Sequence, residues 1–440
     1  MLRLREMRSA LEKAKTQGVS MQRRLVLYWF SMALAILAAV LLVVSLTGMF
    51  SNTAQKLGQS LSIQERNTAS ALAGQMDQLT AQSIALSEEL TRELDKQLAA
   101  GGRTFSALND DPRAIALVET ALYPALNTYL KSGACSGAVF CLDATANTAL
   151  PGAATSRAGL YLRYSALRAI GATDQHVTCF RGTAETARSA QVQMHNRWNP
   201  ELNAALIPGS DQVTAYQGAR LADGCLWTKR TELPDTWEQV MLLCVPILDG
   251  GGTVRGFCGA EISDLYFSLS HNTVPSAFGN MLTLAAPIDG DSLLLSGAML
   301  GATDGSRLTA NGILHISDGK YYTTYSDGKN TYLGRHQLLD AATWDGIPPA
   351  AVTLVPDGTF RSYEKGSQIA WFLGAVLFLL AMLVVATVLS RQFVKPINKS
   401  LAAVRGGAEM VASGIPEIDE LLAAIRERPV SYTHLTLPTN

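Results

Sequence analysis

Two long runs of apolar residues without a charge, 25–50 and 369–390, stand near the two ends of this 440-residue chain. Each exceeds the roughly 20 apolar residues with which a helix crosses a bilayer. The basic residues that flank the two runs are Arg23, Arg24, Arg391, Lys395 and Lys399. Because Lys and Arg collect on the cytoplasmic side, we expect a two-pass protein of the plasma membrane with residues 51–368 outside. A cleaved signal peptide is the alternative for the first run, and a buried core helix is the alternative for either.

The basic lead 1–24 is then cytoplasmic, and a long stalk helix follows the first run. Residues 52–100 contain no proline, and large apolar residues recur along them at the helical spacings of three, four and seven. These positions are Leu72, Met76, Leu79, Leu86, Leu90, Leu94 and Leu98. A second helical stretch is expected at 112–130, and we take 51–124 as the segment of the stalk helix and its helical lead-in. The apolar side of the stalk helix either packs along the chain's own domain or forms the seam of a homodimer. Different lengths of the helix can also do one or the other.

The clearest strand pattern is a hairpin. Two apolar runs, 240–248 and 254–262, flank an Asp-Gly-Gly-Gly segment, which is typical of paired antiparallel strands. Neither run alternates between apolar and polar residues, so we expect both faces of the hairpin to be covered. The residues that follow, 264–269, have the spacing of a short helix.

A second set of short strands begins at residue 278, with Ser-Asp-Gly segments as turns between them. The order of long helix, strand, irregular insert and antiparallel strands predicts an α+β fold. We expect two tandem antiparallel-sheet modules between the apolar runs, a membrane-distal one over 125–275 and a membrane-proximal one over 276–368.

Charge and motifs exclude several functions. The segment 25–390 carries 23 basic and 30 acidic residues, which disfavours nucleic acid as a partner of these residues. The sequence has no glycine-rich phosphate loop, no His-Glu-x-x-His zinc motif and no Gly-x-Ser-x-Gly nucleophile turn. We therefore expect no enzyme, cofactor or metal site in this chain.

Three stretches resemble the double Cache sensors, which are bacterial receptors with two PAS-like modules on a stalk helix between two membrane helices. They are VPILDGGGTVRGFCGAEISDLYFSL, AAVTLVPDGTF and KPINKSL…IPEIDELLAAI. The resemblance implies an extracytoplasmic sensor for a small solute. The third stretch is similar to a shortened HAMP linker over 391–428, with Pro396 in its first helix and Asp419 at the start of its second.

The last residues, 429–440, resemble the translated read-through of a sequencing adapter, so we expect the natural chain to continue into a cytoplasmic output domain. The short juxtamembrane segment resembles that of membrane-tethered regulators and favours a LuxR-type DNA-binding domain. A histidine kinase, a chemoreceptor domain and a cyclic-dinucleotide enzyme are the alternatives. A surface protein that binds without signalling is the rival class.

The chemistry of a small zwitterion suggests a ligand site in the distal module. Such a ligand requires a cation for its carboxylate, an acid for its ammonium group and aromatic walls that exclude water. The candidate residues are Arg157, Tyr161, Arg197, Trp198, Trp227 and Glu261. In amino-acid-binding Cache sensors an Arg and a Trp on the ligand helix act with an Asp on a later strand.

Arg197, Trp198 and Glu261 match that pattern most nearly, although the Arg and Trp are adjacent here and the acid is Glu. Both tryptophans have a core position as their alternative, and Arg157 has a structural carboxylate as its alternative partner. Glu261 is harder to explain as core, because an unpaired buried carboxylate is costly.

All six cysteines lie in the segment expected outside the cell, where disulfides are permitted. Cys244 and Cys258 stand seven residues on either side of Gly251, so a regular hairpin would place them opposite each other. A bulge at the glycines would break that register. Cys135 and Cys141 are the other close pair, and free buried thiols are the default for all six.

Overall fold

The computed structural model describes residues 21–46, 52–165, 167, 176–218, 220–301, 308–310, 312–339, 344, 346–406, 419–420 and 423–424. The chain divides into two compact units, one of Met1–Asn52 with Glu364–Asn440 and the other of Thr53–Tyr363. The basic lead up to residue 20, most of the HAMP-like segment beyond residue 406 and the tail 429–440 lie outside the described residues.

The first unit contains α2 (Met21–Leu46) and most of α8 (Asp357–Gly406). One helical stretch, Asp357–Lys399, is long and apolar enough to cross a membrane by length and composition. A shorter apolar helical stretch covers Leu25–Leu41. The membrane helix predicted at 369–390 therefore has its counterpart in α8, whereas the two-pass topology stays a prediction.

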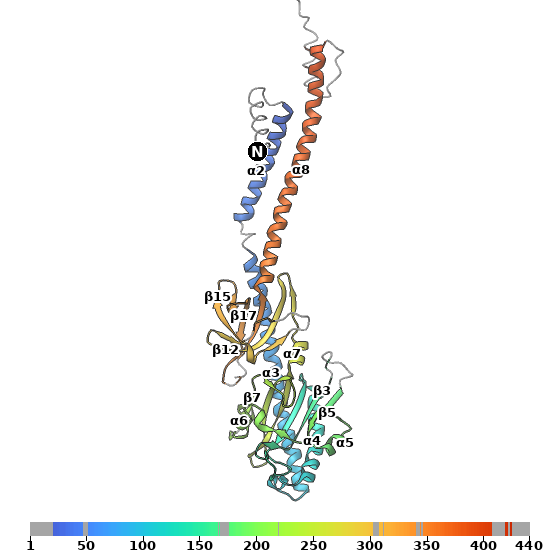
Figure 1. Ribbon diagram of the computed structural model, residues 1–440, viewed down its shortest axis with the longest axis vertical. Helices are drawn as coiled ribbons and strands as arrows, with labels where there is room; N and C mark the ends of the chain where they lie inside the picture. The colour runs from blue at the N-terminus through green and yellow to red at the C-terminus, as the bar shows by residue number, and fades with distance from the viewer. Residues whose placement is uncertain are drawn as a thin grey trace, which may run out of the picture. The chain divides into compact units, whose positions relative to one another are not determined.

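The predicted stalk is a single helix, α3 (Asn52–Ala100), which runs alongside both sheets of the second unit (Figure 1). Leu79, Leu90 and Leu94 are fully buried in the core that α3 shares with the first sheet. Leu57 and Leu61 are buried against residues of the second sheet. The apolar side of α3 thus packs along its own modules, which confirms the first of the two alternatives. A homodimer stays a prediction.

The first sheet has eight strands and lies between residues 137 and 263. Its order is β5-β4-β3-β1-β10-β9-β7, and β8 also pairs with β9. The strands are β1 (Gly137–Leu142), β3 (Gly159–Ser165), β4 (His176–Arg181), β5 (Gln193–Asn199), β7 (Leu226–Trp227), β8 (Thr231–Glu232), β9 (Gln239–Leu248) and β10 (Val254–Ser263). The predicted hairpin is β9 and β10, and its strands are buried along nearly their whole length, as expected.

One pairing of this sheet differs from the antiparallel prediction. Strands β4 and β5 run parallel, because α5 (Ala184–Ser189) carries the chain back to the same end of the sheet between them. Thr183 caps that helix by accepting a hydrogen bond from the backbone N–H of Thr186.

The second sheet also has eight strands and lies between residues 274 and 356. They are β11 (Val274–Ser276), β12 (Gly279–Asp289), β13 (Ser292–Leu294), β14 (Met299–Gly301), β15 (Ile313–Asp318), β16 (Thr323–Ser326), β17 (Thr331–Leu338) and β18 (Pro349–Pro356). Strand β12 pairs with both β13 and β18, so the path from β12 through β15 to β18 closes on itself. In the first sheet β1 likewise lies between the next long strand, β3, and the last strand, β10. In each sheet a long early strand, β1 or β12, therefore lies beside the last strand of that sheet.

Short elements complete the second unit. The helices are α4 (Pro112–Ser132), α6 (Ser210–Thr214) and α7 (Asp264–Ser270), with single helical turns η1 (Phe105–Leu108), η2 (Ala204–Leu206), η3 (Leu221–Gly224) and η4 (Leu295–Gly297). Strands β2 (Ser156–Arg157) and β6 (Leu202–Asn203) form a two-stranded ribbon. The short helix predicted after the hairpin is α7, which Ser263 caps at its start.

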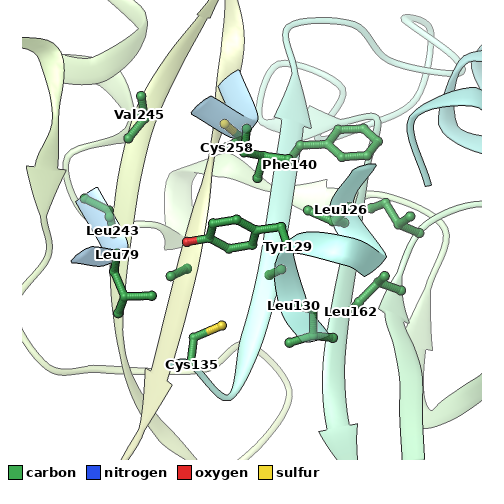
Figure 2. Close-up of a cluster of buried hydrophobic side chains, with 14 of the residues drawn as sticks. Leu79, Leu126, Tyr129, Leu130, Cys135, Phe140, Leu162, Leu243, Val245 and Cys258 are labelled. Atoms are coloured by element: carbon green, nitrogen blue, oxygen red, sulfur yellow. The ribbon is translucent and has the colours of Figure 1, made fainter. Parts of the chain in front are cut away.

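The first sheet has a different cover on each face. Side chains on one face, such as Phe140 and Leu243, pack with α3 and α4 in a large core in which Tyr129 stands between strands and helices (Figure 2). The hydroxyl of Tyr129 is hydrogen-bonded to Ser83 of α3 at 2.6 Å. Side chains on the other face, such as Tyr161 and Leu242, pack against the segment 202–233. We call this second face the insert face, and the candidate site lies on it.

The register of the hairpin corrects one predicted disulfide. Val254 pairs with Leu248, but Gly256 pairs with Ile247, so the strand bulges at Arg255. Every later pair moves by one position, and Cys258 stands opposite Val245 rather than Cys244. Cys258 faces the α3 side of the sheet, and Cys244 faces the other side. The predicted bond between them is wrong, and the bulge that was its alternative is present.

The second predicted disulfide is wrong for a similar reason. Cys135 packs in the core around Tyr129, where Figure 2 shows it, whereas Cys141 belongs to the insert face. All six cysteines are free thiols, and all but the half-buried Cys225 are buried. Their interpretation as small apolar core residues is confirmed.

Candidate ligand site

The centre of the site is a buried ion pair between Arg163 on β3 and Glu261 on β10. Nε of Arg163 donates to Oε2 of Glu261 at 2.6 Å, and Nη2 donates to Oε1 at 3.1 Å. The same carboxylate accepts the hydroxyl of Tyr161 at 2.6 Å and the hydroxyl of Ser136 at 2.6 Å. Glu261 is 0% exposed. Its charge is tolerated because a cation and two hydroxyl groups replace the water that it has lost.

A glycine makes this ion pair geometrically possible. Strand β1 lies between β3 and β10, and its residue Gly137 pairs with Glu261 on one side and with Arg163 on the other. A Cβ at Gly137 would stand 2.9 Å from Oε2 of Glu261. The missing side chain therefore leaves the space in which the two long side chains meet across the middle strand.

The surroundings of the ion pair keep the hydroxyl of Tyr161 protonated and the guanidinium of Arg163 charged. Burial raises the pKa of Tyr161 well above its usual value, and the nearby Glu261 carboxylate adds to this, so the hydroxyl stays a donor. Burial alone would lower the pKa of Arg163, but the charge of Glu261, the influence of Tyr161 and the hydrogen bonds to Glu238 and Glu261 together outweigh burial and raise that pKa. Arg163 is thus a fixed cation.

A cleft of about 520 Å³ opens above Arg163. Glu238, which precedes β9, accepts a hydrogen bond from Nη2 of Arg163 at 2.7 Å. Burial opposes ionisation of Glu238, but its hydrogen bond and ion pair with Arg163 hold its pKa below the usual value. The cleft is also lined by His195, Arg230, Trp237 and Asp264. Arg230 pairs with Asp264 at 2.6 Å, so each arginine of the cleft faces a carboxylate.

Two polar atoms at the cleft have no partner among the described residues. Nη1 of Arg163 donates to none of them, and Oε1 of Glu238 accepts from none of them. A positively charged hydrogen-bond donor, Arg163, and a negatively charged acceptor, Glu238, therefore stand side by side on the wall of a cavity of ligand size. This arrangement suits a small molecule that carries both a carboxylate and an ammonium group.

Of the predicted site residues, only Glu261 and Tyr161 meet at this centre. Arg197 on β5 is exposed, and its backbone carbonyl accepts a hydrogen bond from Arg181 at 2.7 Å. The indole of Trp198 donates to the carbonyl of Gly182 at 2.9 Å and packs at the edge of the core. The indole of Trp198 therefore helps to hold β5 to the sheet, and the ligand-binding role of Arg197 and Trp198 stays a prediction.

The other two predicted residues also lie elsewhere. Trp227 is buried in the core that faces α3, and its indole N–H reaches Thr80 at 3.4 Å. Arg157 pairs with Asp143 at 2.9 Å beside a separate cavity. Trp227 is therefore a core aromatic residue, and Arg157 forms a structural ion pair. Both were the alternatives to a ligand-binding role.

Sequence reasoning missed Arg163, Glu238 and Ser136. A signal for Arg163 was present, because in Gly-Leu-Tyr-Leu-Arg-Tyr-Ser the residues Tyr161 and Arg163 alternate with two leucines. This spacing places both side chains on one face of a strand. Among the described residues no group of three or more His, Cys, Asp or Glu side chains is placed to hold a metal ion.

Comparisons with known proteins found similar chains among solved structures alone. No family model matches the chain, and no curated protein matches it. Among solved structures, it is similar to "Methyl-accepting Chemotaxis protein X" with 14% identity and a TM-score of 0.37, over 68% of this chain and 97% of that one. It is also similar to the sensory domain of the Campylobacter jejuni chemoreceptor Tlp3 with isoleucine bound, with 11% identity, a TM-score of 0.39, and coverage of 71% and 97%.

A third similar structure is the ligand-binding domain of the Pseudomonas aeruginosa chemoreceptor PctB in complex with L-Arg. It is 12% identical, with a TM-score of 0.37 and coverage of 69% of this chain and 96% of that one. All three of these solved structures come from chemoreceptors or chemotaxis proteins. Their ligands are not assigned to this chain by a likeness at this level.

Proposed function

We propose that the unit Thr53–Tyr363 is the extracytoplasmic sensor of a membrane signalling protein and that it binds a small molecule with a carboxylate and an ammonium group. The observation that carries the proposal is the cleft wall, where Arg163 and Glu238 each keep one unpartnered polar atom among the described residues. The ligand carboxylate would accept from Nη1 of Arg163, and its ammonium group would donate to Glu238.

The buried residues beneath the cleft support this role. Glu261 fixes the guanidinium of Arg163 through two hydrogen bonds, so Arg163 lines the cleft in a constant orientation. A preorganised donor loses less side-chain freedom on binding than a flexible one. Glu261 is accordingly a positioning residue, and it does not itself line the cleft.

Signalling would follow from the packing of α3. The helix contributes to the core behind the first sheet and to the core on the second sheet, so a change at either sheet can act on the same helix. A ligand transmits a signal only if it binds two arrangements of these elements with different affinity. The output that receives the signal, for which a LuxR-type domain is the sequence-based prediction, lies outside the described residues.

The test is a binding screen of the full chain in lipid nanodiscs against amino acids, carboxylates and amines, read as a shift of the melting temperature. We expect compounds with both groups to raise the melting temperature and those with one group to act weakly. Arg163→Met should remove the response. The control, Arg188→Met, changes an exposed arginine on α5 and should leave it intact. A screen with no responding compound, or an unaltered response in Arg163→Met, would contradict the proposal.

A further inference from the structure

The turn 233–238 separates the cleft from a second cavity on the insert face. On one side, Trp237 and Glu238 line the polar cleft. On the other side, Leu233 and Pro234 line a small cavity of about 20 Å³ whose other walls include Phe180, Leu206 and Ile207. This volume holds about one water molecule, so the second cavity cannot take an organic group while the turn is in place.

Two ion pairs hold the outer part of the turn on the sheet. Glu238 pairs with Arg163 at 2.7 Å, and Asp235 pairs with Arg181 at 2.8 Å. Both guanidinium groups lie over the ring of Phe180, with Cζ of Arg181 at 3.8 Å and Cζ of Arg163 at 5.5 Å from its centroid. These two ion pairs, which we call the latches of the turn, therefore both hold an arginine that lies over one aromatic ring.

The contacts within the turn are local, and its tip is exposed. The N–H of Leu233 donates to the carbonyl of Glu238 at 2.8 Å, and Asp235 has a left-handed φ of 62°. Trp237 is 87% exposed. Leu233, by contrast, is buried on the insert face. The turn is thus a short strap, anchored at Leu233 and attached elsewhere mainly by charged side chains.

The two latches differ in strength. Arg163 keeps Glu261 as a buried carboxylate partner if Glu238 departs. Arg181 has Asp235 as its one carboxylate partner among the described residues, and its other acceptors are backbone carbonyls such as those of Phe180 and Arg197. The Asp235 side chain is 64% exposed, and exposed ion pairs are worth little because water competes for both charges.

We propose that the turn 233–238 is a gate, and that its opening joins the polar cleft to the apolar cavity in a single two-part site. This inference rests on the proposed function and narrows the ligand to a zwitterion with a compact apolar side chain. The ligand carboxylate would bind Arg163 and its ammonium group would bind Glu238, while the turn opens at the Asp235 latch and the side chain enters between Phe180, Leu206 and Ile207.

The first test compares glycine with L-leucine as probes, by isothermal titration of the full chain in nanodiscs. We expect L-leucine to bind at least tenfold more tightly, because its side chain leaves water for an apolar cavity and glycine has no such side chain. Leu206→Trp, a change at a half-exposed wall of the apolar cavity, should remove this advantage and leave glycine binding unaltered. Equal affinities for the two probes, or binding of neither, would overturn the inference.

The second test concerns the latch and needs no ligand. Asp235→Asn should raise hydrogen exchange of the amides in 233–238 by tenfold or more and leave β9 unaffected. Asp223→Asn, at an exposed aspartate outside the turn, is the matched control. Unaltered exchange in Asp235→Asn would overturn the gate. If the screen finds a ligand but L-leucine binds no more tightly than glycine, the gate is rejected and the proposed sensor function is retained.

Discussion

Nε of Arg163 lies 2.6 Å from Oε2 of Glu261, although the two residues stand on strands that β1 separates. The contact crosses Gly137, the one position of β1 that pairs with both residues. A long cation, a long anion and a glycine between them thus form one structural unit in the middle of the sheet.

Gly137→Ala should destabilise the protein. The added methyl group would meet Oε2 of Glu261 at 2.9 Å and the backbone carbonyl of Leu162 at 3.0 Å. We expect a loss of about 1–3 kcal/mol in the free energy of unfolding, measured by urea denaturation. Gly74→Ala is the control, because nothing lies within 4 Å of a Cβ there and alanine favours the helix α3. Equal stability of the two variants would contradict the role given to Gly137.

The ion pair should show strong coupling in a double-mutant cycle. Arg163→Met leaves the buried carboxylate of Glu261 without its cation, which costs roughly 3–5 kcal/mol. Glu261→Leu leaves Arg163 with Glu238 alone and should cost less. The double variant should be more stable than the sum of both losses predicts, by 1 kcal/mol or more. Additive losses would show that the pair is not a unit.

Glu119 should make stability depend on pH. This carboxylate on α4 is buried and accepts hydrogen bonds from the N–H groups of Gly159 and Thr183, and burial raises its pKa from 4.5 to about 7. The folded state therefore binds the proton more tightly than the unfolded state. The stabilisation is complete below about pH 4.5 and is lost as the pH rises to about 7, by about 3 kcal/mol.

Melting temperatures between pH 4.5 and 7.5 test this expectation. The wild type should lose stability across this window, and Glu119→Gln should flatten the profile. Glu185→Gln, which removes an exposed carboxylate on α5, should retain the wild-type slope. A wild-type slope in Glu119→Gln would assign the dependence to another group.

The cysteines should behave as six thiols that react slowly. Burial raises the pKa of Cys244 to about 12 and that of the half-buried Cys225 to about 11. Since the thiolate is the reactive form, iodoacetamide at pH 8 should modify Cys225 first and the buried five only on unfolding. Intact mass before and after reduction should agree. A mass gain of two hydrogens on reduction would show a disulfide that the structure does not have.

Periodicity and turn residues predicted the elements because both are local properties. The leucine spacing at 72–98 was sufficient for α3, and apolar runs around glycines were sufficient for the β9–β10 hairpin. The parallel pair β4–β5 was missed, since the short helix α5 that reverses the chain lies in a polar stretch without a strong pattern.

The sequence by itself determined the long apolar helix in α8, the stalk α3 and the β9–β10 hairpin, and it marked Glu261 as a carboxylate that needs a partner. The tertiary structure alone decided that Arg163, 98 residues away, is the partner of Glu261, and that Arg197 is not. The bulge at Arg255, which moves Cys258 out of register with Cys244, was likewise evident only in the tertiary structure. The physical reason is that strand order and register set which side chains meet, and both depend on the packing of the whole sheet.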